Sequence, residues 1–180
     1  TLELGGKSPN VVLADADLDA AVKAAVIGRY QNTGQVCAAA KRFIIEDSIV
    51  QAFTDKFVEA TRALPLGNPL EDATYIGPMA RFDLRDELDG QVQASLAEGA
   101  TLLLGGHKIE GTANFYAPTV LGDVTPDMTA FKQELFGPVA AIIAARDSDH
   151  AVALANDSEF GLASTIYTAD LTLAERMTAA

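Results

Sequence analysis

Cys37 is the single cysteine of this 180-residue chain and lies in the segment NTGQVCAAAKR. The thiolate is the nucleophilic form of cysteine, and a helix start or a nearby cation stabilises it. Lys41 and Arg42 follow by four and five residues, and we expect Cys37 to lie beside a helix start. The segment makes Cys37 a candidate nucleophile, although most free cysteines are buried and inert.

Glu3 is the matching candidate for a general base. It lies between Leu2 and Leu4 and before two glycines, in the stretch ELGGKSPN. Partial desolvation raises the pKa of a carboxyl group toward the range that proton abstraction requires. Taken alone, Glu3 is better explained as an exposed turn residue. A thiol that forms a thioester, however, needs a base to activate the water that clears it, which favours the functional interpretation.

The Gly-Lys-Ser of the same stretch does not form a phosphate-binding loop. Such a loop has a further glycine five positions before the Gly-Lys pair, and a helix that starts at the Ser. Thr1 occupies that glycine position, and Pro9 biases Ser8 away from helical backbone angles.

Glu134 and Phe136 form a third candidate pair, in the segment KQELFGPV. In an extended backbone the two side chains point to the same side. A carboxylate can accept hydrogen bonds from a ribose diol, and an aromatic ring can pack on a planar heterocycle. The alternative is a plain loop with one hydrophobic anchor.

The composition favours small-molecule chemistry. The net charge of −12 repels nucleic acid and anionic membranes, so we expect neither as a partner. A lone thiol is typical of a reducing compartment, which predicts a cytoplasmic location. His107 and His150 have no recognisable metal-ligand spacing, so we expect no metal site.

The apolar pattern predicts strands that alternate with helices. We expect strands at 11–13, 43–46, 101–106, 139–145 and 162–168. We expect helices after Asp17, from Ser48 to Pro65, from Leu84 to Gly99, from Ser148 to Ala155 and from about Leu171, with residues 38–42 as a possible further helix. Near-continuous apolar strands between amphipathic helices predict a three-layer αβα domain with a largely parallel sheet, which is an α/β fold without an internal domain boundary.

Four segments in order resemble the aldehyde dehydrogenase superfamily: ELGGKSPN, GQVCAA, ELFGPV and ANDSEFGLAST. The resemblance covers essentially all of residues 1–180 and implies the family's catalytic domain, without its nucleotide-binding domain or the last segment of the chain. The longer run NTGQVCAAAKRFI, with GPMARFDLRDEL, is most similar to bacterial succinate-semialdehyde dehydrogenases.

The resemblance implies a role for each candidate residue. Cys37 would attack the aldehyde to give a thiohemiacetal, and Glu3 would activate water against the thioester that follows. The backbone carbonyl of Leu4 would hold the nicotinamide amide of NAD or NADP, with Glu134 on the ribose and Phe136 beside the ring. The product would be the free acid, because relatives that transfer the acyl group elsewhere do not rely on this glutamate.

The same resemblance implies what the chain would lack. An asparagine of the family's oxyanion hole lies upstream of these residues, so we expect this fragment alone to be nearly inactive. The full-length protein would be a homo-oligomer. Two other hypotheses are a non-catalytic remnant that binds a partner through its apolar surface, and a thiol redox module based on Cys37.

Overall fold

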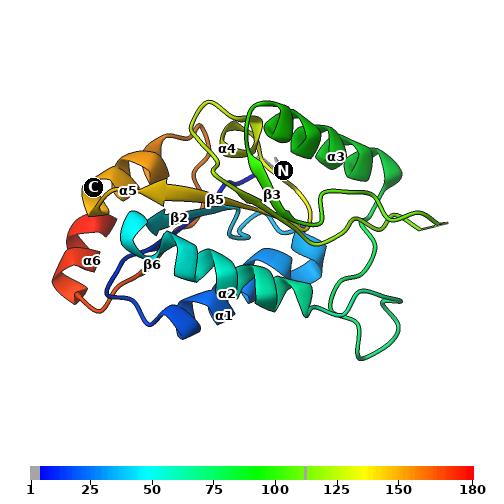
Figure 1. Cartoon of the computed structure of the whole chain (residues 1–180), viewed down its shortest axis with the longest axis horizontal. Helices are drawn as coiled ribbons and strands as arrows, with labels where there is room; N and C mark the ends of the chain where they lie inside the picture. Colours follow the sequence, from blue (N-terminus) through cyan, green and yellow to red (C-terminus); the bar gives the residue numbers. More distant parts are fainter. Residues whose placement is uncertain (1–4, 112) are drawn as a thin grey trace.

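The computed structural model describes residues 5–111 and 113–180 (Figure 1). The strands are β1 (Pro9–Val12), β2 (Arg42–Glu46), β3 (Thr101–Leu104), β4 (Thr119–Gly122), β5 (Val139–Ala145) and β6 (Thr165–Tyr167). The helices are α1 (Leu18–Tyr30), α2 (Val50–Arg62), α3 (Phe82–Ala97), α4 (Thr129–Lys132), α5 (Ser148–Asn156) and α6 (Leu171–Thr178), with 3-10 turns at Gln31–Gly34 and Asp47–Ile49. Glu3 and Leu4 lie outside the described residues.

The six strands form one sheet in the order β3-β4-β5-β2-β1-β6. Every neighbouring pair is parallel except β3 and β4, which are antiparallel. Helices cover both faces, with α1 and α2 along one face and α3 along the other (Figure 1). The predicted three-layer α/β fold with a largely parallel sheet is confirmed.

Two hydrophobic cores separate the sheet from its helices. Val11 and Ile44 face the core that contains Leu88 of α3. The next residue of each strand faces the opposite core, as the pleat of a strand requires. Burial on both faces explains why these strands are apolar at consecutive positions.

Aspartate side chains cap the starts of α1, α5 and α6. Asp17 accepts a hydrogen bond from the backbone N–H of Ala20 and caps α1, as predicted. Asp147, rather than Ser148, caps α5 through the N–H of His150. The prediction that Ser48 opens the second helix is also inaccurate, because Ser48 lies in a 3-10 turn and α2 begins at Val50.

Two further predictions differ from the structure. Residues 38–42 do not form the predicted helix: the chain passes through a turn and enters β2 at Arg42. The short strand β4 was not expected, and it lies between β3 and β5 in the sheet.

Within the described residues, every helix is too short or too polar to span a lipid bilayer.

Candidate active site

The segments that carry the candidate residues each precede a strand. Gly5 and Gly6 precede β1, Cys37 precedes β2, and Glu134 precedes β5. These three strands are parallel neighbours in the order β5-β2-β1. Their amino-terminal ends therefore meet at one edge of the sheet, and the fold brings the three segments together there.

Cys37 is half-buried in a turn between the 3-10 turn Gln31–Gly34 and β2. The expected helix start beside it is wrong, so helix N–H groups do not stabilise its thiolate. Its surroundings are set instead by the backbone before it and by two buried cations, Arg29 and Lys41.

The backbone before Cys37 adopts an uncommon conformation. Asn32, Thr33 and Gly34 have φ of 52°, 57° and 73°, in the left-handed region that a β-branched residue such as Thr33 rarely enters. The Thr33 hydroxyl accepts a hydrogen bond from the N–H of Gly77 at 3.1 Å and donates to its carbonyl at 3.2 Å. These contacts hold the turn against the loop that follows α2.

Arg29 holds both ends of the segment that contains Cys37. Its guanidinium donates to the carbonyl of Gly34 at 2.6 Å and to that of Ala40 at 3.0 Å. The side chain is fully buried on α1, and burial lowers the pKa of Arg29 to about 10, so it remains charged at neutral pH. Arg29 lies outside the sequence motifs from which the candidate residues were predicted.

Lys41 contacts the turn and Glu134 together. Its ammonium donates to the carbonyl oxygens of Val36 at 2.9 Å and Cys37 at 2.8 Å, and it pairs with Oε1 of Glu134 at 2.9 Å. Burial lowers the pKa of Lys41, and the hydrogen bond to Glu134 opposes that shift. The predicted cation beside Cys37 is present, and it acts on the backbone of that residue.

Arg42 does not reach the Cys37 turn. Its guanidinium donates to the carbonyl oxygens of Leu154 and Ala155, each at 2.8 Å, near the end of α5. It also lies over the ring of Phe131 at 5.0 Å. The prediction that Arg42 stabilises the thiolate is therefore not supported by its contacts.

The two glycines of the first segment allow a close approach to the other two. The N–H of Gly6 donates to Oε1 of Glu134 at 3.1 Å. A Cβ at Gly6 would lie 2.6 Å from the carbonyl oxygen of Cys37, and one at Gly5 would collide with Oε2 of Glu134. Gly6 thus has no room for a Cβ against the backbone of Cys37, and Gly5 has φ of 74°, which favours glycine. Glu3 precedes Gly5 by two residues.

Glu134 and Phe136 line the same hollow, which has a volume of about 410 Å³. Leu135 between them is buried at 1% exposure and anchors the segment. Lys41 also lies 5.9 Å from the centre of the Phe136 ring. The structure therefore brings Glu134 and Phe136 to one side, as the extended segment predicted.

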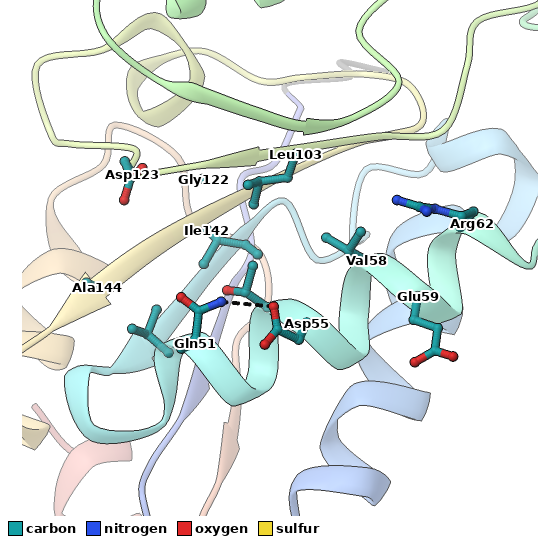
Figure 2. Close-up of a pocket in the computed structure, with 12 residues that line it drawn as sticks. Gln51, Asp55, Val58, Glu59, Arg62, Leu103, Gly122, Asp123, Ile142 and Ala144 are labelled. Atoms are coloured by element: carbon teal, nitrogen blue, oxygen red, sulfur yellow. Dashed lines mark hydrogen bonds between the residues drawn. The ribbon is translucent and has the colours of Figure 1, made fainter.

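A larger hollow of about 650 Å³ lies elsewhere, between α2 and the strands β3, β4 and β5 (Figure 2). Gln51 and Asp55 of α2 are hydrogen-bonded to each other beside it at 2.9 Å (Figure 2). None of the candidate residues lines it. Within residues 5–111 and 113–180, no three His, Cys, Asp or Glu side chains are grouped to hold a metal ion.

The sequence model of the aldehyde dehydrogenase family matches residues 1–180. The chain therefore belongs to the aldehyde dehydrogenase family, and the resemblance read from its four segments is confirmed.

The likeness to bacterial succinate-semialdehyde dehydrogenases is also confirmed. Succinate semialdehyde dehydrogenase [NAD(P)+] Sad of Escherichia coli is 65% identical over 178 residues, 99% of this chain and 38% of that protein. Succinate-semialdehyde dehydrogenase [NADP(+)] of Mycolicibacterium paratuberculosis is 50% identical over 94% of this chain and 36% of that protein. The chain thus spans less than two-fifths of these relatives.

Solved structures of other aldehyde dehydrogenases contain the same fold. The crystal structure of lactaldehyde dehydrogenase from Escherichia coli matches with a TM-score of 0.96 and 40% identity, covering 99% of this chain and 38% of that one. Betaine aldehyde dehydrogenase from Staphylococcus aureus, in complex with NAD+, matches with a TM-score of 0.95 and 34% identity over 99% and 36% of the two chains.

Proposed function

We propose that residues 1–180 are the catalytic domain of a longer NAD(P)-dependent aldehyde dehydrogenase that oxidises an aldehyde to the carboxylic acid. The observation that carries this proposal is the meeting of three segments at one edge of the sheet. Gly6 contacts Cys37 and Glu134, and Lys41 contacts both as well. The proposed nucleophile, Cys37, and the proposed cofactor-binding carboxylate, Glu134, thereby lie close together.

Cys37 is the proposed nucleophile. Its thiolate would attack the aldehyde carbon, forming a C–S bond and a thiohemiacetal whose oxygen carries the developing negative charge. The bound NAD or NADP would supply the acceptor for the hydride that leaves this carbon. The thioester that results remains on Cys37 until water attacks it.

Glu3 is the proposed base for that water. It would take a proton from the water as the oxygen attacks the thioester carbonyl, and the Cys37 sulfur would leave as the thiolate. The position of Glu3 lies outside the described residues. The proposal is supported by Gly6, which follows Glu3 by three residues and lies close to the carbonyl oxygen of Cys37.

The residues around the 410 Å³ hollow fit a nicotinamide cofactor. Lys41 and Gly6 bind Oε1 of Glu134. Among the described residues, no hydrogen bond is made to Oε2 of the same carboxylate. Oε2 can therefore accept from a ribose hydroxyl, with Phe136 on the same hollow. The carbonyl of Leu4 would hold the amide of the nicotinamide.

Succinic semialdehyde is the proposed substrate, because relatives at 65% and 50% identity are named for it. A homo-oligomeric state and a cytoplasmic location remain predictions. The partner-binding remnant and the thiol redox module remain as alternative hypotheses, and both predict a full-length protein without dehydrogenase turnover.

A substrate panel tests the proposal. The full-length protein is assayed with succinic semialdehyde and with neutral aldehydes of similar length, each with NAD and with NADP. We expect kcat/KM for succinic semialdehyde to exceed that of the neutral aldehydes by about tenfold or more, as the loss of one charge-assisted contact would give. Equal values would remove the substrate assignment, and no turnover with any aldehyde would contradict the enzyme assignment.

A further inference from the structure

Lys41 uses every donor of its ammonium group on the candidate site. An ammonium has three N–H donors, and Lys41 places them on the carbonyls of Val36 and Cys37 and on Glu134. The three distances lie between 2.8 and 2.9 Å, and the side chain is 1% exposed. A neutral amine has only two N–H donors, so this arrangement requires the charged form.

The two ends of this contact belong to different segments. The carbonyls of Val36 and Cys37 lie in the turn before β2, whereas Glu134 lies before β5. The carbonyl of Val36 also accepts the N–H of Ala39 at 3.1 Å, which closes the turn. Lys41 is therefore the side chain that joins the turn of the nucleophile to the carboxylate beside the 410 Å³ hollow.

We propose that Lys41 is a positioning residue that couples the Cys37 turn to Glu134. It fixes the carboxylate through Oε1, which keeps Oε2 for the ribose, and it fixes the carbonyls on which the turn depends. This inference rests on the proposed function where it concerns the cofactor. The tie between Lys41 and the turn is independent of any activity.

Removing Lys41 should change two separate properties. Among the described residues, Glu134 would lose its charged partner and keep only the Gly6 N–H, so its carboxylate would be freer to rotate. The carbonyls of Val36 and Cys37 would also lose a donor, which costs more when the acceptor is buried. Lys41→Arg keeps the charge, but its planar fork does not reproduce the directions of the three ammonium donors.

A double-mutant cycle in the full-length enzyme separates coupling from general destabilisation. The KM for NAD and NADP is measured for the unmodified enzyme, Lys41→Met, Glu134→Gln and the double variant. We expect Lys41→Met to raise the cofactor KM about tenfold, and to change it less than about twofold when Glu134 is already Gln. An unchanged KM in Lys41→Met, or an undiminished effect in the double variant, would overturn the coupling.

Hydrogen exchange provides a readout that needs no activity. We expect amide exchange at residues 36–40 to quicken at least about tenfold in Lys41→Met and to stay unchanged in Glu134→Gln, where the contacts of Lys41 with the turn persist. Unchanged exchange in Lys41→Met would refute the tie to the turn. Absence of turnover in the unmodified enzyme would count against the proposed function instead.

Two further variants complete the design. Lys56→Met is the control, because Lys56 forms an exposed pair with Asp19 at 2.7 Å, away from the site. It should leave the cofactor KM and the exchange at 36–40 unchanged. If Lys41→Met does not fold, Lys41→Arg still tests the inference: the KM should stay within about threefold of the unmodified enzyme while exchange at 36–40 quickens. The opposite pattern would overturn it.

Discussion

Lys41 and Arg42 are adjacent in sequence, yet their side chains have different surroundings. Lys41 turns back to the Cys37 turn, whereas Arg42, in β2, reaches the carbonyls at the end of α5. Consecutive residues at the start of a strand point to opposite faces of the sheet, so only one of the two cations can lie beside Cys37. The sequence alone points to both residues and does not distinguish between them.

Lys7 carries a pH dependence that follows from its burial. The side chain is 3% exposed, and within the described residues its ammonium has no hydrogen-bond partner. Burial and, to a smaller extent, the charge of Arg42 lower the pKa of Lys7 to about 7, while Asp157 and Glu134 oppose the shift. Its unfolded pKa is near 10.5.

The sign of the effect follows from the protons bound in each state. Between pH 7 and pH 10.5 the unfolded chain holds a proton that folded Lys7 has lost, so this residue makes stability rise with pH, by at most about 1.4 kcal/mol per pH unit. Below pH 7 both states are protonated and the burial penalty is complete. Urea unfolding from pH 6 to 9.5 should show this rise in the unmodified protein and a smaller slope in Lys7→Met. Parallel slopes would contradict it.

Helices and strands were predictable where the local pattern and the tertiary packing agree. Asp17 and the apolar face after it identified α1, and the apolar run at 139–145 identified β5. The strand β4 has only four residues, between Pro118 and Asp123, and its burial depends on pairing with β3 and β5. No local signal distinguishes such a segment from a loop.

The predicted helix at 38–42 is wrong for a related reason. Alanine and lysine favour a helix, but the backbone N–H groups of Ala40 and Lys41 donate to Gly28 and Ser8, and side chains bind carbonyls at this turn. Arg29 binds the carbonyl of Ala40, and Lys41 binds that of Cys37. These contacts, together with the pairing of β2, override the local preference.

Arg29 offers a test at this scale. Arg29→Met should remove two charge-assisted hydrogen bonds and leave the carbonyls of Gly34 and Ala40 without this donor, at a cost of about 3 kcal/mol in unfolding free energy. Denaturant unfolding measures this cost, and hydrogen exchange should place the loosening at residues 34–40. Arg62→Met is the control, because the side chain of Arg62 is exposed. A loss of less than about 1 kcal/mol would show that Arg29 does not hold the turn.

The whole molecule places its candidate site at the amino-terminal edge of three parallel strands. Open α/β sheets more often bind ligands at the carboxyl edge. Here the glycine segment, the Cys37 turn and the Glu134 segment precede β1, β2 and β5, which are neighbours. Sequence analysis predicted a parallel sheet, but the order of strands depends on long-range pairing, so the meeting of the segments became visible only in the fold.

The central claim is that Cys37 carries the acyl group between oxidation and hydrolysis. Mass spectrometry of the full-length Glu3→Gln variant, mixed with succinic semialdehyde and NAD(P), tests it directly, because the loss of the base should let the thioester accumulate. We expect a burst of reduced cofactor equal to one turnover and an acyl adduct that peptide mapping assigns to Cys37. Full steady turnover without an adduct, or an adduct on another residue, would contradict the account.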